Sequence, residues 1–282
     1  MSLRKSIASR MDHFAMRLLA AVNRFAYRRF HEYPFGSEPL AGEERYRELW
    51  QKEREREYPA VDERERCLGF AIDRKWFEEL ALLTQVTIKK EPLCYQHGRL
   101  LYAELSAYIS RADAACVNIL EVGTARGFSA LCMAKALSDA RQPGKILTFD
   151  VLPHNTKMLW NCVADASGSR SRAELLGRYG KLLEEYIVFE QGDTSIELCK
   201  VAIPRIHFAF LDGTHTYDRA RAEFEFVSGS QEAGDIVFFD DYTQSCFPGI
   251  VRAVDDGCTE KRYSKEVVLA TDARGYAVAK KK

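Results

Sequence analysis

The chain has 282 residues, 46% of them hydrophobic and 29% charged, which suits one large domain, or one domain with an extension, and excludes a globally disordered protein. Lys+Arg and Asp+Glu both number 41, so the zero net charge gives no bulk argument for a nucleic-acid partner, and none is expected. No stretch approaches the ~20 apolar residues of a membrane span, and arginines interrupt the N-terminal region where a signal peptide would need an apolar core. Cytoplasmic residence is therefore expected, with buried reduced thiols such as Cys116 and Cys132.

The first third of the chain predicts helices. Residues 3–29 form an amphipathic pattern with arginines along one flank of the apolar face. Such a helix can pack on its own domain or on a second subunit, or it can lie on an anionic membrane surface. Residues 42–66 predict a solvated, mixed-charge helix broken near Pro59, and residues 74–84 predict another short helix. We treat residues 1–94 as a helical N-terminal extension that serves as a substrate cap, a dimerisation surface or a membrane contact.

Strands and helices alternate over residues 95–282. The expected strands are, in chain order, 117–122, 145–150, 187–191, 206–212 and 235–240. The expected helices are 100–109, 129–140, 175–186, 217–227 and 249–258. This alternation predicts an α/β fold with a parallel sheet covered on both faces. Only a turn separates two further strands, 266–270 and 275–279, which predicts an antiparallel hairpin.

The turn after the first strand predicts a binding site for an anionic group. It reads Glu121-Val-Gly123-Thr124-Ala-Arg-Gly127, so two glycines stand four residues apart where a strand ends and a helix begins. Glycine permits a sharp turn and the close approach of a ligand, and a helix N-terminus offers free N–H groups. The spacing departs from the dinucleotide fingerprint G-x-G-x-x-G. A plain strand–helix connection would give the same pattern.

Two aspartates end neighbouring strands and suggest an adenosine pocket. Asp150 closes the second strand, where a carboxylate can accept hydrogen bonds from both hydroxyls of a ribose. Asp193 follows the third strand, in position to reach an adenine amino group. Each alone could be an ordinary loop aspartate.

The fourth and fifth strands end in a second set of acidic residues. Asp212 ends one strand, and Asp240 and Asp241 end the other. Three converging carboxylates repel one another, and a hard cation such as Mg²⁺ relieves that repulsion and can lower the pKa of a bound hydroxyl. His215, three residues after Asp212, could take the hydroxyl proton. The alternatives are that the aspartates only close turns and that His215 is structural.

Four segments resemble class I S-adenosylmethionine (SAM)-dependent methyltransferases, and among these the metal-dependent O-methyltransferases. YQHGRLL and NILEVGTARGFSALCMAKAL resemble the catechol and caffeoyl-CoA type, while FLDGTHTYDRARAEF and GDIVFFDDY resemble the macrocin type. The resemblance covers roughly residues 95–280. It implies a Rossmann-like, doubly wound, seven-stranded sheet of strand order 3-2-1-4-5-7-6 whose last hairpin is antiparallel.

The resemblance also implies roles for individual residues. The methionine part of SAM would be surrounded by Glu121, Gly123 and Ser129. Its adenosine would be held by Asp150 and Asp193. The metal would be bound by Asp212, Asp240 and Asp241.

Three departures from the relatives concern the metal and the base. Many relatives have Asp-Asn where this chain has Asp240-Asp241, and either pair supplies oxygen ligands. The macrocin type often carries an acidic residue at the position of Thr214, and its absence here shifts the role of base toward His215. The catechol type uses a lysine near the first metal aspartate, and residues 213–218 contain none.

The expected function is methyl transfer from SAM to a hydroxyl oxygen of a small molecule. Asp212 and the other aspartates would hold Mg²⁺, and His215 or solvent would accept the proton. The alternatives are a non-enzymatic SAM-binding or membrane-peripheral protein and a nicotinamide-dependent oxidoreductase. The missing third glycine and the terminal hairpin count against the oxidoreductase.

Overall fold

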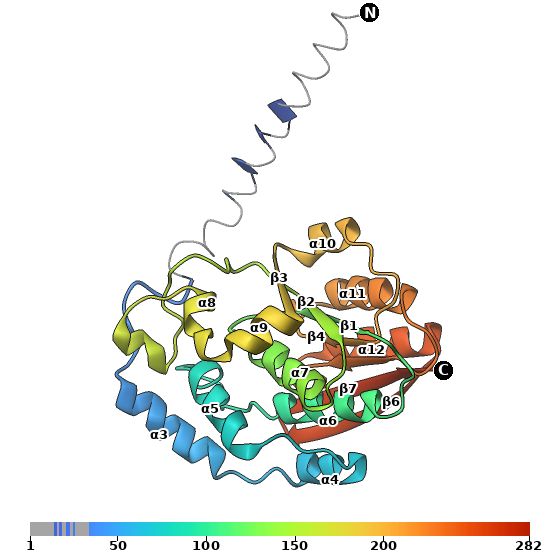
Figure 1. Cartoon of the computed structure of the whole chain (residues 1–282), viewed down its shortest axis with the longest axis horizontal. Coiled ribbons are helices and arrows are strands. Elements are labelled where there is room, and N and C mark those ends of the chain that lie inside the picture. Colours follow the sequence, from blue (N-terminus) through green and yellow to red (C-terminus); the bar gives the residue numbers. More distant parts are fainter. Residues whose placement is uncertain (1–13, 16, 19–20, 23–24, 26–33) are drawn as a thin grey trace, which may run out of the picture.

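The computed structural model describes residues 34–282 and, before them, residues 14–15, 17–18, 21–22 and 25. Within this part, seven strands form one sheet with the order β3-β2-β1-β4-β5-β7-β6 (Figure 1). The strands are β1 Val117–Val122, β2 Gly144–Asp150, β3 Ile187–Gln191, β4 Phe208–Leu211, β5 Ile236–Phe239, β6 Tyr263–Thr271 and β7 Arg274–Lys281. Neighbours from β3 to β5 are parallel, and β7 runs antiparallel to both β5 and β6. The predicted fold is confirmed.

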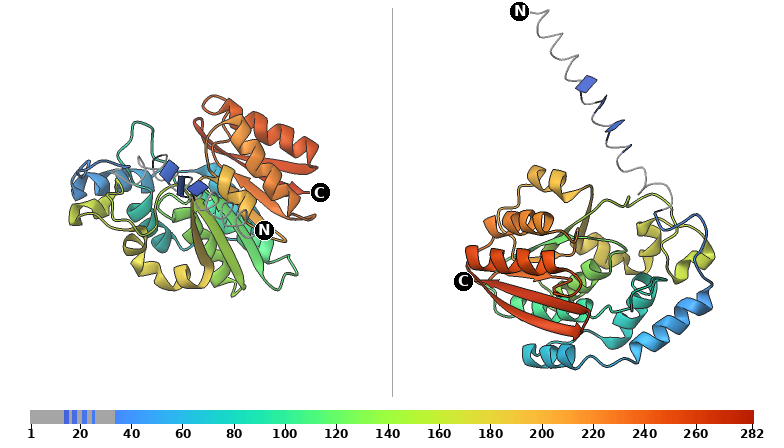
Figure 2. Two further views of the ribbon diagram at one scale, coloured as in Figure 1. Left: turned by 90° about the horizontal axis from the view of Figure 1, so that it is seen from above. Right: turned by 180° about the vertical axis from the view of Figure 1, so that it is seen from behind.

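Helices cover the sheet on both sides (Figure 2). The longer ones are α3 Glu43–Arg54, α4 Pro59–Leu68, α5 Arg74–Thr84, α6 His97–Ile109, α7 Phe128–Asp139, α9 Gly180–Tyr186, α11 Tyr217–Gly229 and α12 Pro248–Glu260. The shorter ones are α8 Arg172–Leu175, α10 Thr194–Glu197, η1 Val163–Ser167, η2 Gly177–Tyr179 and η3 Leu198–Lys200.

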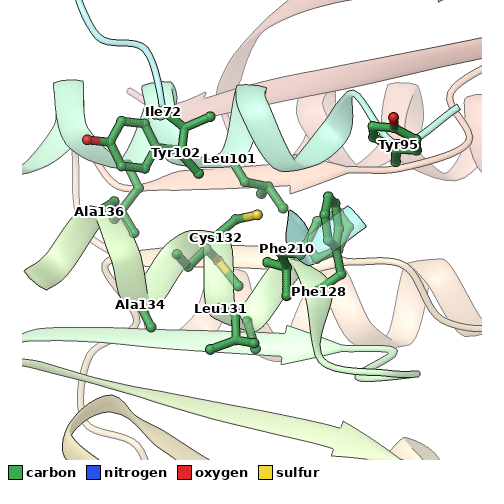
Figure 3. Close-up of a cluster of buried hydrophobic side chains, with 14 of the residues drawn as sticks. Ile72, Tyr95, Leu101, Tyr102, Phe128, Leu131, Cys132, Ala134, Ala136 and Phe210 are labelled. Carbon is green, nitrogen blue, oxygen red and sulfur yellow. The ribbon is translucent and has the colours of Figure 1, made fainter. Parts of the chain in front are cut away.

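The strands alternate between two hydrophobic clusters, one on each face. Phe210 and Phe238 belong to the cluster that contains α5, α6 and α7, and Leu211 and Phe239 belong to the cluster that contains α11 and α12. Figure 3 shows Leu101 of α6 next to Cys132 of α7 in the first cluster. Because successive residues of a strand point to opposite faces, a strand buried on both sides is apolar throughout, as these strands are.

The helical extension shares the first of these clusters. Tyr46 of α3, Val61 of α4 and Phe77 of α5 are buried in the same cluster as α6 and α7. Pro59 stands at the first position of α4, where its missing N–H costs nothing, and so separates α3 from α4 as expected.

The predicted amphipathic helix at residues 3–29, here called the basic N-terminal segment, lies largely outside the described residues. Its four described apolar positions, Phe14, Leu18, Val22 and Phe25, are helical and more than half exposed. No helix of the described part is long and apolar enough to cross a membrane.

Three local predictions needed correction. The helix expected at 175–186 is divided into α8, η2 and α9, with Gly177 and Gly180 starting the later pieces. The strand expected at 206–212 is shorter, because only 208–211 pair as a strand. All eight cysteines, each within the described residues, are free, but Cys116 is exposed, whereas Cys132 is buried as expected.

Candidate active site

Glu121 is the most deeply buried acid of the candidate site. It stands in β1 with no exposed surface, and its Oε2 accepts a hydrogen bond from Thr148 of β2. Oε1 is buried without a hydrogen-bond partner. Burial raises the pKa of Glu121 to about 7, against the lowering effect of the Ser129 and Thr148 hydroxyls. A buried carboxylate with an unpaired oxygen is suited to receive a cationic group such as an ammonium.

The glycine turn is shaped by packing between strands. Gly123 has φ +96°, and a Cβ there would lie 2.1 Å from the Asp212 carbonyl oxygen. Gly127 has φ +85°, and its Cβ would lie 2.7 Å from Leu176 Cδ1. Both glycines are therefore required by the backbone and its neighbours, and this requirement is separate from the ligand approach expected from the sequence. Thr124 is buried, with its Oγ1 2.5 Å from that of Thr148.

Asp150 lies at the end of β2 and faces the same turn. Its carboxylate accepts hydrogen bonds from the backbone N–H groups of Ala125 and Leu152. Burial raises its pKa, although Arg172, with Nη2 3.9 Å from Asp150 Oδ2, acts in the opposite direction. The carboxylate predicted to hold a ribose is thus beside the glycine turn.

Asp193 lies beyond β3, and its side chain stabilises the local structure. It caps α10 by accepting from Ser195 N at 2.9 Å, and it pairs with Arg219 of α11 at 2.6 Å. These contacts lower its pKa despite some desolvation.

Asp212, His215 and Asp241 meet at the tips of β4 and β5. His215 Nε2 lies 2.5 Å from Asp241 Oδ2 and 3.9 Å from Asp212 Oδ1. One ligand atom from each residue falls within 4.8 Å of the others. Hydrogen bonding to Asp241 raises the pKa of His215, whose ring stacks on Phe247 with 4.8 Å between centroids. Burial and the neighbouring Asp240 carboxylate raise the pKa of Asp212 well above its usual value.

Arg274 neutralises part of the charge of the three converging carboxylates. Its guanidinium, at the start of β7, donates to Asp240 Oδ2 at 3.0 Å and to Asp241 Oδ1. The Asp240 side chain is fully buried and also accepts from Asp241 N at 2.7 Å. The structure therefore groups His215 with Asp212 and Asp241, whereas Asp240 is held by Arg274.

Residues 120–242 match a family model described as a methyltransferase domain. This part of the chain is therefore similar to methyltransferase domains. No curated protein matches the sequence at a significant level.

The fold is also shared by solved structures. The B. cereus O-methyltransferase in complex with SAH (S-adenosylhomocysteine) is 15% identical, with 81% of this chain and 93% of that chain covered and a TM-score of 0.50. Cofactor-bound Rv0187 from MTB is 17% identical, with 74% and 90% covered and a TM-score of 0.53. The Streptomyces achromogenes O-methyltransferase TomG in complex with SAM is 15% identical, with 76% and 92% covered and a TM-score of 0.51. At these identities the likeness establishes the fold.

Two arginines near the candidate site were not predicted from the sequence. Arg172 is 2% exposed, donates through Nε to Ala125 O at 2.8 Å, and leaves its buried Nη2 without a hydrogen-bond partner. No motif marks this arginine, because it lies in the segment between β2 and β3 that carried no pattern. Arg274 could have been found, because β7 is antiparallel to β5 and its first residues must lie beside the end of β5, where Asp240 follows.

Proposed function

We propose that this protein is a SAM-dependent O-methyltransferase that methylates a hydroxyl group of a small molecule. The observation that carries the proposal is the placement of two complementary features at one edge of the sheet. The unpartnered Glu121 oxygen lies at the tip of β1, and the Asp212–His215–Asp241 cluster lies at the neighbouring tips of β4 and β5. Gly123 brings the two tips into contact, because it packs directly on Asp212.

The residues around the glycine turn fit SAM. Glu121 would bind the ammonium of its methionine part and Asp150 the ribose hydroxyls, with Gly123, Thr124, Gly127 and Ser129 shaping the turn between them. Asp193 would lie near the adenine. SAM supplies an activated methyl group on a sulfonium, so the protein mainly has to align the acceptor oxygen with it.

His215 is suited to take the proton of the acceptor hydroxyl. Its hydrogen bond to Asp241 orients the ring and favours the protonated form, in the way that a carboxylate supports a catalytic histidine. Its side chain is 47% exposed, so the proton can pass on to solvent.

As an alternative to His215 acting as the base, the cluster fits a divalent cation with a revised set of ligands, because an imidazole that binds a metal cannot also take the acceptor proton. We assign Asp212, His215 and Asp241, with Arg274 and Asp240 outside this set as supporting groups. One imidazole nitrogen with two carboxylates suits Mn²⁺ or Zn²⁺ at least as well as the Mg²⁺ expected from the sequence. A bound cation would polarise the acceptor oxygen.

Ligand binding and turnover test the proposal. SAM and SAH should raise the melting temperature and NAD should not. Release of SAH in the presence of hydroxyl-bearing acceptors and divalent cations should be lost in Asp212→Ala and strongly reduced in His215→Gln. Stabilisation by NAD alone would overturn the proposal in favour of an oxidoreductase, and full turnover of both Asp212→Ala and Asp241→Ala would exclude assistance by a metal.

The basic N-terminal segment would provide the contact with a partner. Its four exposed apolar side chains, together with its arginines, support either a homodimer contact or an anionic membrane surface. Residence in the cytoplasm is part of the same proposal, and the free state of all the cysteines supports a reducing compartment.

A further inference from the structure

A cavity of about 540 Å³ lies between α3 and the segment 87–93 that precedes α6. This volume is within the range of small-molecule binding sites. Its apolar lining is Leu49, Ile88, Pro92 and Leu93. Its charged lining is Arg45, Lys52, Arg56, Lys89, Glu53 and Glu91. The cavity thus combines an apolar body with several cationic groups.

The cavity carries an excess of positive charge. Arg45 is paired with Glu48 at 2.9 Å, but within the described part of the chain Lys52, Arg56 and Lys89 have no carboxylate within ion-pair distance. Glu53 is buried and accepts a hydrogen bond from Tyr58, and burial raises its pKa although the charges of Arg56 and Lys89 act in the opposite direction. Three cations therefore face the cavity with only Glu91 as an exposed acid.

Asn161 fixes both walls of the cavity. Its side chain accepts from the Ile88 backbone N–H and donates to the Ile88 carbonyl oxygen, both at 2.9 Å. The same Oδ1 accepts from Tyr46 of α3 at 3.1 Å. Because one residue ties α3 to the segment 87–93, the cavity is held open by the fold, as expected of a preorganised site.

The cavity adjoins the candidate active site. Cys94 follows the segment 87–93, and its sulfur lies 3.6 Å from the hydroxyl of Tyr276, which is two residues from Arg274 along β7. The Lys89 ammonium is close enough to Arg274 and Asp241 to interact with both, and its pKa is lowered by burial and by repulsion from Arg274. Lys89 is thus a residue of the cavity lining that interacts electrostatically with the carboxylate cluster.

We propose that this cavity binds the acceptor as an organic anion with an apolar body. The apolar part would contact Leu49, Ile88 and Leu93, and a carboxylate or phosphate would be held by Lys52, Arg56 and Lys89. The acceptor hydroxyl would then extend past Lys89 toward Asp212. The role as acceptor site rests on the proposed methyltransferase function, whereas anion binding by the cavity does not.

Calorimetric titration of the full-length protein with 1-naphthyl phosphate tests this proposal, with 1-naphthalenemethanol as the neutral counterpart. The phosphate should bind more tightly than the alcohol, and Lys52→Gln/Arg56→Gln should weaken the phosphate by about tenfold or more while leaving the alcohol and SAH unchanged. Arg47→Gln is the matched control, because Arg47 lies on α3 outside the cavity lining and pairs with Glu43.

Each result decides between the alternatives. Equal binding of phosphate and alcohol, or an unchanged affinity in the double variant, would overturn anion binding by the cavity. Displacement of 1-naphthyl phosphate by SAH would overturn the acceptor role, because the two ligands should bind together. A protein that binds 1-naphthyl phosphate as expected but fails to bind SAH would refute the methyltransferase function and leave the anion site intact.

Discussion

Replacing Glu121 with glutamine should make the ligand-free protein more stable while destroying its affinity for the cofactor. The Glu121 pKa is about 7 in the folded protein and 4.5 as a model value. Between these values the folded state binds the extra proton, so the stability contributed by this group falls as the pH rises. The free-energy cost of burying the ionised Glu121 carboxylate is small below pH 4.5 and fully present above pH 7.

The size of the effect follows from the shift. At 1.36 kcal/mol per pKa unit, the full cost of the buried carboxylate is about 3 kcal/mol. Linkage gives a difference between Glu121→Gln and the wild type of about 1 kcal/mol at pH 5 and about 3 kcal/mol at pH 8. Glutamine keeps an oxygen that can accept from Thr148, so the hydrogen bond to that hydroxyl need not be lost.

Denaturant unfolding at pH 5 and pH 8 measures this difference, and calorimetric titration with SAH measures the functional loss. Glu223→Gln is the matched control, because Glu223 on α11 is also buried with a pKa raised to about 7, mainly by desolvation. That control should show a similar pH-dependent gain in stability but keep its affinity for SAH. A stability difference that does not change with pH, or wild-type binding of SAH by Glu121→Gln, would refute the reasoning.

Three further predictions concern the rest of the site and the extension. Arg274→Met should lower the free energy of unfolding by about 3–5 kcal/mol, because it leaves buried Asp240 and its neighbour Asp241 without their cation. Added Mn²⁺ should raise the melting temperature of this variant more than that of the wild type. If Arg274→Met melts at the wild-type temperature, the ion pairs of Arg274 are unimportant for stability. Gly123→Ala should abolish folding or SAH binding, because its Cβ would collide with the Asp212 carbonyl, and soluble protein with normal SAH affinity would contradict this. Through the basic N-terminal segment, the full-length protein should sediment with vesicles containing phosphatidylglycerol and remain in solution with pure phosphatidylcholine; if it binds neither, and runs as a dimer on a sizing column, the segment is a subunit contact.

The sheet could be predicted from sequence because its information is local. Each of the central strands is a short apolar run bounded by turn residues, and strand β1 was placed at its observed limits, Val117–Val122. The piece of chain from 152 to 172 could not be predicted, since its conformation depends on distant partners. Asn161 adopts φ 51° and bonds to Ile88, which is 73 residues away, and no local pattern reveals such a contact.

The candidate site shows the same division between local and long-range information. Carboxylates at strand ends were found because parallel strands bring their carboxyl ends to one edge. How those charges are compensated depends on which side chain arrives from elsewhere in the chain, and here Arg274 arrives from β7 to pair with Asp240. From the sequence alone a metal is the expected partner, because repulsion between carboxylates indicates only that some cation is needed.

Arg274 also bears on why a metal and a guanidinium could share one site. Asp241 binds Arg274 through Oδ1 and His215 through Oδ2, so each of its two oxygens has a different partner. One oxygen is committed to an internal cation that holds the tip of β5 against β7, and the other points to Asp212 and His215. The ion pair between Asp241 and Arg274 therefore orients Asp241 Oδ2 for catalysis. A divalent cation would have to displace the bond between Asp241 and His215 rather than the bond to Arg274. On this reasoning, activity should respond to divalent cations through His215, whereas the integrity of the fold should respond to Arg274.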